Sequence, residues 1–430
     1  MGLIVTIDVA ARSRPTAMAV ALSVGSLAAA LAGCGAPAQA SPVAGRAAVA
    51  SLVAPQAATP GWRAIATQAN AVMVGGLSAS GKSNAWLSEA ICAAGACADL
   101  TGLTGRQLRW NGTAWRSVTL PKAYAGGIVV PGSAASNWIV GSVPDGKNAT
   151  RNVILHWTGK DPETATPLAK NVGIGTGVAP SAKDAWLFGA SAVGGPDGST
   201  YALHYTGRAW KPVTVPFVGE GASASSPANV WVSGYSVGDD AAGVMAFNGT
   251  KWRTVPLPPL PSSLLYTGSG NIAVASQQSV WLEIERTADV GNSTPYLLHW
   301  TGSKWTSIKI PYGLDDLGGA PVAQDGHGGV WLSLMNIKDP AHAKSYLLHY
   351  LNGTWTRIPV PATPGSEVVA PVTLTWIPGT RSLWGAATEW NPKSPKSPGK
   401  VLILKYGPLV AWSVPLSGVP GPVWHRGGHG

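Results

Sequence analysis

Four histidines recur at one position of a repeated segment and could, by residue type, bind a metal ion. They are His156, His204, His299 and His349, and Arg109, Ala246 and Lys405 occupy the same column in other copies. Ligand nitrogens lie at about 2 Å from a bound metal, so a shared ion needs its ligands close together. Each repeat contributes one histidine, and if the repeats are arranged in a ring the four histidines are too far apart to share one ion. We therefore expect no metal or cofactor, and a solvent-side or hydrogen-bonded strand position beside a packing aromatic residue.

Residues 76–83, GLSASGKS, match the phosphate-binding P-loop pattern. A P-loop follows a strand and opens a helix, whose N-terminus holds the phosphate. Here the match ends just before Trp86, in a register where similar segments begin a strand. We expect Lys82 in a loop or at a strand start, with no helix behind it and no nucleotide site.

Two carboxylates, Glu283 and Glu285, flank Ile284 and point to one face of an expected strand. Such a pair can serve acid–base chemistry. No arginine or histidine partner accompanies it in the sequence. We interpret the pair as part of a solvated strand face and assign no catalytic residue.

The elements that would position these residues are marked by a recurring tryptophan. Successive copies lie about 50 residues apart, a period typical of radial or linear repeat arrays. The seven copies are Trp86, Trp138, Trp186, Trp231, Trp281, Trp331 and Trp384. Each lies in a short apolar segment that follows a stretch rich in Ser, Ala, Asn or Asp.

Two further segments follow each marked tryptophan. The first carries an aromatic column, namely Trp110, Trp157, Tyr205, Phe247, Trp300, Tyr350 and Tyr406. The next carries Trp115, Trp210, Trp252, Trp305, Trp355 and Trp412, whereas the second copy reads KDPETATPL over 160–168 and lacks this tryptophan. Short segments rich in β-branched and aromatic residues, bounded by Gly, Pro, Asn and Ser, predict strands.

Asn-Gly pairs lie between the last two segments at 111–112, 248–249 and 352–353. Asn-Gly accepts positive φ at both positions, so a type I′ hairpin is expected there. Small-residue stretches precede each marked tryptophan and suit a crowded inner strand. Four strands in each of seven units predict an all-β fold, a seven-bladed β-propeller of four-stranded antiparallel blades over residues 61–416.

Trp62 supplies an extra copy of the last segment. A terminal strand that covers an open edge would close the ring on the last blade. The sequence leaves open which chain end supplies that outermost strand. Most tryptophans belong to the repeat columns, so we interpret them first as blade-packing residues.

The aromatic–Asn–Gly–Thr–x–Trp turn resembles a degenerate Asp box, with Asn or Thr in place of the acid. With its Trp-rich blades, the repeat resembles propellers of the Asp-box and tectonin-like kind that are common in secreted actinobacterial proteins. The resemblance covers roughly residues 60–416 and implies the fold. No motif here matches the acidic and arginine residues of sialidase-type propellers, so no catalytic role is transferred.

The N-terminal segment resembles a bacterial lipoprotein signal. Arg12 and Arg14 precede an apolar run that ends in LAGC at Cys34. We expect residues 1–33 to be the signal peptide, Cys34 to be lipidated, 34–60 to form an Ala/Pro-rich tether and 417–430 a tail. The alternative is a plain signal peptide with an incidental cysteine. The protein would thus be extracytoplasmic and lipid-anchored to the cell membrane.

Cysteine and charge usage agree with export. Cys92 and Cys97 are the other two cysteines, and outside the cytoplasm we expect them to form a disulfide. The net charge is +10, with the basic residues scattered. Anionic wall polymers or lipid head groups suit this charge, whereas nucleic-acid binding would need a concentrated patch. We expect a monomer.

Long loops between the second and third strands are the expected ligand-binding face, because rigid scaffolds carry function on such loops. The candidate residues there are Asp145, Lys147, Arg151, Asp197, Tyr235, Asp239, Asp240, Arg286, Asp289, Lys338, Asp339, His342 and Trp390. The first hypothesis is a non-catalytic binding or scaffold module for a cell-wall glycan, polymer or protein partner. The alternative is an exported glycan-directed hydrolase or lyase with its site in the channel.

Overall fold

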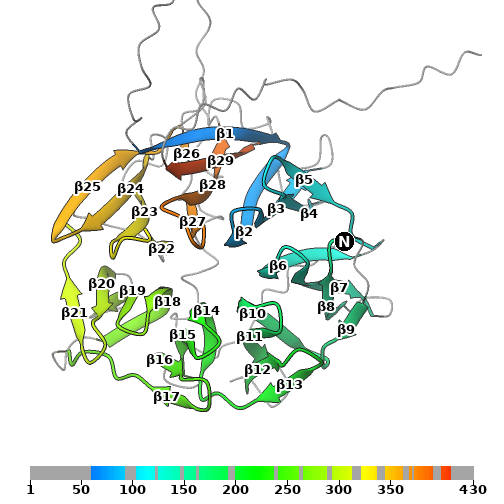
Figure 1. Cartoon of the computed structure of the whole chain (residues 1–430), viewed down its shortest axis with the longest axis horizontal. Coiled ribbons are helices and arrows are strands. Elements are labelled where there is room, and N and C mark those ends of the chain that lie inside the picture. Colours follow the sequence, from blue (N-terminus) through cyan, green and yellow to red (C-terminus); the bar gives the residue numbers. More distant parts are fainter. Residues whose placement is uncertain are drawn as a thin grey trace, which may run out of the picture.

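The computed structural model places strands and turns in a closed ring (Figure 1). The structure describes residues 60–92, 103–121, 124–145, 150–160, 164–191, 199–236, 241–260, 265–287, 293–311, 321–336, 344–361, 368–369, 372–390 and 399–407. Seven antiparallel sheets of four strands radiate from the centre, and the last sheet carries one additional short strand. The predicted seven-bladed β-propeller is therefore confirmed.

The first and second strands of each blade form its inner half. The innermost strands are β2 (Ala71–Gly81), β6 (Ala125–Ser133), β10 (Val172–Ser181), β14 (Val218–Ser226), β18 (Leu265–Ser276), β22 (Val322–Gln324) and β27 (Thr373–Trp376). Neighbouring innermost strands contact each other around the whole circle, including β2 and β27. The second strands are β3 (Asn84–Cys92), β7 (Ser136–Pro144), β11 (Asp184–Ser191), β15 (Asn229–Tyr235), β19 (Ser279–Thr287), β23 (Val330–Asn336) and β28 (Leu383–Trp390).

The third and fourth strands complete the blades toward the rim. The third strands are β4 (Leu103–Trp110), β8 (Thr150–Trp157), β12 (Ser199–Tyr205), β16 (Ala242–Phe247), β20 (Ser293–Trp300), β24 (Lys344–Leu351) and β29 (Lys400–Gly407). The outer strands are β5 (Trp115–Val118), β9 (Thr164–Pro167), β13 (Trp210–Val213), β17 (Trp252–Thr254), β21 (Trp305–Ile308), β25 (Thr354–Pro359) and β1 (Gly61–Ala69), while β26 (Val368–Val369) also pairs with β28. Blades 1 to 7 are numbered from β2–β5 onward.

The marked tryptophans hold neighbouring blades together, as the repeat pattern predicted. All seven are at most 1% exposed. Each lies with its ring centroid 4.8–5.9 Å from the third-strand aromatic ring of the following blade. At five junctions an outer-strand tryptophan of the following blade adds a second contact, made by Trp62, Trp115, Trp210, Trp252 and Trp305.

The N-terminal strand closes the ring. β1 pairs antiparallel with β29, and Trp62 stands opposite Tyr406 in the register. The Trp62 ring also lies 5.5 Å from that of Trp331 in blade 6. The expectation for Trp62 is thus confirmed, and the N-terminal side supplies the outermost strand of blade 7. Trp412 lies outside the described residues.

The Asn-Gly turns differ from the expected type at two of the three sites. Asn352 and Gly353 both have positive φ, as a type I′ hairpin requires. At 111–112 and 248–249 only the glycine has positive φ, so the type I′ prediction was wrong there. The physical reason is the Asn111 side chain, whose Oδ1 accepts bonds from the backbone of Thr113 and Ala114 and stabilises a wider turn.

The P-loop match does not lie at a helix. Lys82 is in the turn between β2 and β3, as predicted, and its carbonyl accepts a 3.0 Å bond from Trp110 Nε1. Within the part of the chain that the structure describes, no helix is long and apolar enough to cross a membrane.

Candidate functional site

The residues predicted on the long-loop face fall partly within the structure. Asp145 and Arg151 lie at the β7–β8 end of blade 2 and form an ion pair with 3.4 Å between Oδ2 and Nη2. Tyr235 ends β15, Trp390 ends β28, and Arg286 is the penultimate residue of β19. These five residues therefore lie at or beside strand ends next to the long loops, and their part in ligand binding stays a prediction.

Other predicted residues lie outside the described residues. They are Cys34, Cys97, Lys147, Asp197, Asp239, Asp240, Asp289, Lys338, Asp339 and His342. Cys92 is the last residue of β3. The lipidation of Cys34 and the Cys92–Cys97 disulfide consequently stay predictions.

The histidine column has a structural role in each blade that carries it. His204 and His299 stack on the marked tryptophan of their own blade, with ring centroids 3.7 Å apart and interplanar angles of 9° and 3°. Each Nε2 is also hydrogen-bonded, as in the 2.8 Å contact of His349 with Asp325 Oδ2. The expected hydrogen-bonded position beside a packing aromatic residue is confirmed. Among the described residues, no three potential metal ligands lie together.

The interpretation of Glu283 as part of a solvated face was wrong. Glu283 is 1% exposed, and Asn271 Nδ2 approaches its Oε2 at 3.5 Å. It shares the face of β19 with Trp281, which packs against blade 6, so burial follows from the blade interface. Glu89 in blade 1 is also buried and forms an ion pair with Arg106. Burial raises the pKa of the Glu89 carboxyl.

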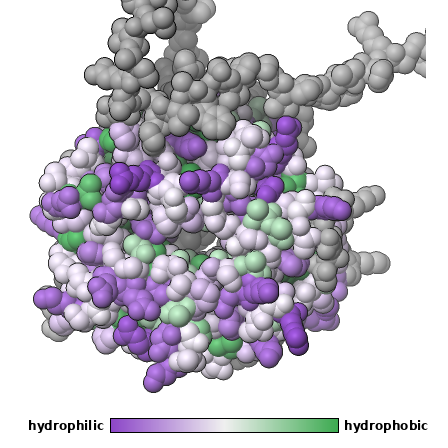
Figure 2. All heavy atoms as spheres, viewed as in Figure 1, coloured by the Kyte–Doolittle hydropathy of each residue, from purple (hydrophilic) through white to green (hydrophobic). Residues whose placement is uncertain are grey.

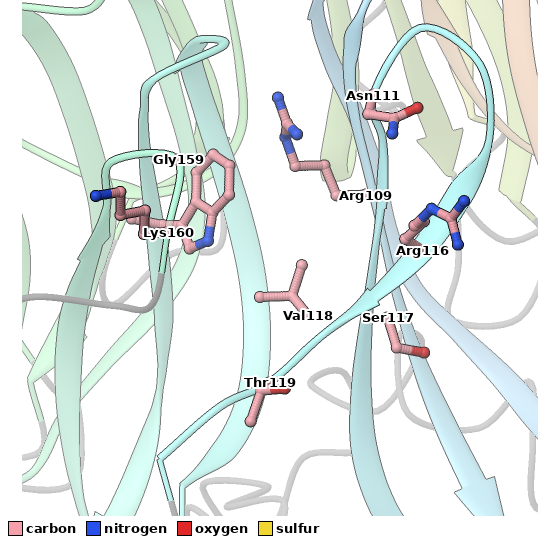
Figure 3. Close-up of a pocket in the computed structure, with 9 residues that line it drawn as sticks. Arg109, Asn111, Arg116, Ser117, Val118, Thr119, Gly159 and Lys160 are labelled. Carbon is pink, nitrogen blue, oxygen red and sulfur yellow. The ribbon is translucent and has the colours of Figure 1, made fainter.

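A pocket lies between blades 1 and 2, on the face of the short third-to-fourth strand turns. Its volume is about 270 Å³. The lining residues are Arg109, Asn111, Arg116, Ser117, Val118, Thr119, Trp157, Gly159 and Lys160. Figure 3 shows Gly159 and Lys160 on one side and Arg109 with the β4–β5 hairpin on the other.

The pocket occurs where blade 2 departs from the repeat. At five other junctions an outer-strand tryptophan of the following blade packs against the marked tryptophan, for example Trp252 against Trp186 at 5.1 Å between centroids. The corresponding segment of blade 2 has no tryptophan, and among the described residues Trp157 is the aromatic ring of blade 2 that meets Trp86, at 5.2 Å. The pocket lies at this junction, and its described lining includes polar and basic side chains.

Arg109 is fixed in the pocket by its neighbours. Its Nε donates to Asn84 Oδ1 at 3.1 Å, and its Nη2 donates to the Ala134 carbonyl at 3.1 Å. Its Cζ lies 4.5 Å from the centroid of the Trp157 ring, which is a cation–π arrangement. These acceptors are neutral, so the positive charge of Arg109 is positioned without being cancelled. Burial lowers the pKa of Arg109, which nonetheless stays charged near neutral pH.

The other lining groups add charge and hydrogen-bonding capacity. Arg116 and Lys160 are exposed, and no carboxylate is among the described residues that line the pocket. Asn111 uses its amide oxygen within the turn, which leaves the NH₂ group as a donor. Ser117 and Thr119 contribute hydroxyl groups. Guanidinium and ammonium groups without carboxylate partners suit an oxyanion, and hydroxyl and amide groups suit a hydroxyl-rich ligand.

Sequence reasoning placed the ligand on the opposite face and did not select this pocket. Two sequence signals mark it. The first is the loss of the outer-strand tryptophan over 160–168, and the second is an arginine at position 109 in a column where four copies carry histidine. Either signal indicates a site only when it is known that residues of this column contact the neighbouring blade.

Glu220 is a further unusual ionisable group, on the innermost strand β14. It lies between Gly219 and Gly221, where the register of β14 against β15 shifts at a bulge. Burial raises the pKa of its carboxyl to about 7. In the unfolded chain the Glu220 carboxyl ionises near its usual pKa. Between that pH and about pH 7, the folded protein therefore keeps a proton that the unfolded chain has lost.

Glu220→Gln should therefore stabilise the protein in a pH-dependent way. As pH rises from about 4.5 to about 7, the unfolded state loses the proton first, and the free energy of unfolding falls. Above pH 7 the folded protein bears the whole cost of burying the ionised carboxylate, about 1–2 kcal/mol after allowance for partial exposure. Urea unfolding at pH 8 should show the variant as more stable than the wild type, and at pH 4 the two should coincide. Equal stabilisation at both pH values would contradict the burial of an ionisable carboxyl.

No protein-family model matches the chain, and no curated protein matches it. Solved structures do match it in fold. An ulvan lyase, described as a polysaccharide lyase, is 12% identical with a TM-score of 0.50, covering 79% of this chain and 95% of that one. A xyloglucanase from Xanthomonas campestris is 13% identical with a TM-score of 0.48, covering 79% of this chain and 55% of that one.

YCF48, solved with a bound peptide, is 13% identical with a TM-score of 0.45, and the match covers 80% of this chain and 94% of that one. Lectins solved with methyl fucoside are also among the matches, at TM-scores of 0.42 and 0.39. The matched propellers thus include sugar-binding, sugar-degrading and peptide-binding proteins. At these identities the likeness concerns the fold alone.

Proposed function

We propose that this chain is an exported, lipid-anchored propeller that acts as a non-catalytic binding module for a cell-wall glycan, polymer or protein partner. The main observation that supports this proposal is the pocket between blades 1 and 2, where neutral hydrogen-bond acceptors hold Arg109 over the Trp157 ring. An arginine fixed in this way is preorganised to bind a partner group. The Asp-box kinship and lipidation at Cys34 belong to the same proposal and are supported by the sequence patterns.

The pocket gives the proposal a definite surface. It lies on the short-turn face, whereas Tyr235, the last residue of β15, lies on the long-loop face. Figure 2 shows one face of the ring as mostly polar or neutral and hollowed near its centre, without a broad hydrophobic patch. Polar recognition at a blade junction therefore suits this molecule better than an apolar docking surface.

Retention on purified cell-wall material tests the proposal. Arg109→Gln should reduce retention about tenfold, because a hydrogen bond to a charged group is worth about 1.5–3 kcal/mol. Exchange of the 235–243 loop should leave retention unchanged if the pocket is the site. Unfolding midpoints of both variants would show that they are folded. Cys34→Ala, expressed in cells, should move the protein from the membrane fraction to the medium.

Three results would overturn the proposal. Absence of retention by the wild-type protein would remove the binding role. Loss of retention on loop exchange, with Arg109→Gln unaffected, would place the site on the long-loop face. Release of sugar from the wall material that disappears with Glu283→Gln would establish the glycan-directed enzyme instead, because catalysis fails when one essential carboxylate is removed.

A further inference from the structure

The pocket arginine has a counterpart in the preceding blade. Lys405 on β29 occupies the column position of Arg109 on β4, since each stands opposite the marked tryptophan of its own blade. Lys405 Nζ lies 5.9 Å from the Trp110 ring centroid and 5.0 Å from that of Trp384. Consecutive blade junctions, 7/1 and 1/2, therefore each hold a cation over the third-strand indole of the following blade.

Each of these cations also faces a second cation across the blade. Arg109 pairs in register with Arg116, and Lys405 pairs in register with Arg63. Like charges directly opposite on neighbouring strands destabilise a sheet. Burial, and then the positive charge of Arg63, lower the pKa of Lys405. Two doubly basic pairs at equivalent places in adjacent blades thus carry a cost in folding that a bound anion would offset.

The other blades do not repeat the doubly basic pair, although a cation–indole contact recurs at junction 4/5. There Arg253, which pairs in register with Ala246, lies with its Cζ 5.8 Å from the Trp300 ring centroid. His156, His299 and His349 face threonines on their outer strands. In blade 3, His204 faces Lys211, but the carboxylate of Asp184 lies 3.3 Å from the imidazole. The residues that correspond to Asp184 in blades 1 and 7 are the neutral Asn84 and Ser382. At this position blade 3 therefore supplies a carboxylate, whereas blades 1 and 7 supply neutral side chains.

We propose that junctions 7/1 and 1/2 are two successive subsites for a linear anionic carbohydrate polymer. The inference rests on the proposed binding function and names the chemical class of its ligand. Each subsite would hold one oxyanion group of the polymer, and Lys160 of blade 2 adds a cation beside the second. The hydroxyls of Ser117 and Thr119 and the amide of Asn111 suit the hydroxyl groups of the sugar chain.

A two-subsite arrangement predicts that affinity depends on polymer length. A ligand that spans both subsites makes its second contact intramolecularly, so binding strengthens without any new type of contact. A short anion occupies one subsite at a time. Exposed charge–charge contacts are screened by salt, so both affinities should fall as ionic strength rises.

Titration calorimetry with dextran sulfate tests the proposal directly. The full-length protein should bind long dextran sulfate at least tenfold more tightly per chain than a sulfated disaccharide, and should not bind neutral dextran. Arg116→Glu should weaken long dextran sulfate about tenfold or more and should weaken the disaccharide at the 1/2 subsite. Lys405→Gln should abolish the length dependence and should weaken the disaccharide at the 7/1 subsite. The matched control Lys211→Glu, at the register position of Arg116 in blade 3, should retain wild-type affinity.

Parallel titrations with polyphosphate and polygalacturonate separate phosphate and carboxylate from sulfate as the preferred oxyanion. Length-independent binding would overturn the two-subsite proposal, and so would equal weakening by Lys211→Glu, which would indicate nonspecific charge attraction. Equal affinity for single-stranded DNA would overturn the assignment to carbohydrate. Unfolding midpoints would identify any variant that fails to fold, and Arg116→Gln then provides a milder replacement at an exposed position.

The two proposals can fail separately. Retention on wall material without affinity for any of the anionic polymers would leave the binding module standing and overturn the polyanion subsites. Absence of both wall retention and polymer affinity would overturn both proposals.

Discussion

Trp186→Ala should lower the free energy of unfolding by about 3–5 kcal/mol, the range for removal of a large buried aromatic side chain. Trp186 is 1% exposed and lies at the junction of blades 3 and 4. Its ring stacks on His204 and meets Phe247 and Trp252 of the next blade at 4.9 and 5.1 Å. Its replacement opens a cavity that involves both blades, so each loses packing. The midpoint of urea unfolding measures the effect.

Trp355→Ala is the matched control. Trp355 belongs to the outer strand β25, is partly exposed, and donates from Nε1 to the Lys309 carbonyl at 3.2 Å. Because solvent already reaches this ring, its removal should cost less than half as much as that of Trp186. Equal losses at the two positions would mean that the marked column does not form the junction core.

The repeat made most of the fold predictable. Seven marked tryptophans at a nearly constant interval, each in an apolar segment, are followed by an aromatic residue that meets the tryptophan of the preceding blade. This interaction recurs around the ring, so a periodic sequence encodes it directly. Trp62 was likewise recognisable as an extra copy, because it carries the same signal as the other outer strands.

Features that break the period were harder to interpret. Arg109 and Lys405 were visible as exceptions in the histidine column, but their importance depends on which indole lies at the neighbouring junction. The distances from Arg109 to Trp157 and from Lys405 to Trp110 follow from blade packing and not from spacing along the chain. Glu283 shows the same limit, because period-two alternation gives the face of a strand but not which face a neighbouring blade covers.

The pocket also marks the part of the ring where the repeat is least regular. Seven equivalent junctions filled by aromatic residues would be nearly identical in chemistry. The loss of one tryptophan in blade 2 and the charged residues in blades 7 and 1 make this arc of the ring different from the rest. Specificity on a symmetric scaffold then resides where the repeat is least regular, with the regular junctions keeping the scaffold rigid.

Deletion of residues 1–69 should prevent formation of a stable ring, whereas deletion of residues 1–59 should be tolerated. The longer deletion removes β1, whose pairing with β29 runs from Gly61 opposite Gly407 to Ala69 opposite Lys400. It leaves the edge of β29 unpaired, which favours aggregation. It also removes Trp62, which packs against Trp331 and Tyr406, both at 5.5 Å. The tether-only deletion removes neither contact.

Gel filtration and urea unfolding distinguish the outcomes. The 1–59 deletion should elute as a compact monomer with an unchanged unfolding midpoint. The 1–69 deletion should aggregate or unfold at much lower urea, since it loses a whole ladder of hydrogen bonds together with a partly buried indole. A synthetic peptide of residues 60–70 should bind the 1–69 deletion and restore stability, because the edge of β29 remains available to it. A cooperative 1–69 deletion with the wild-type midpoint would show that another segment closes blade 7.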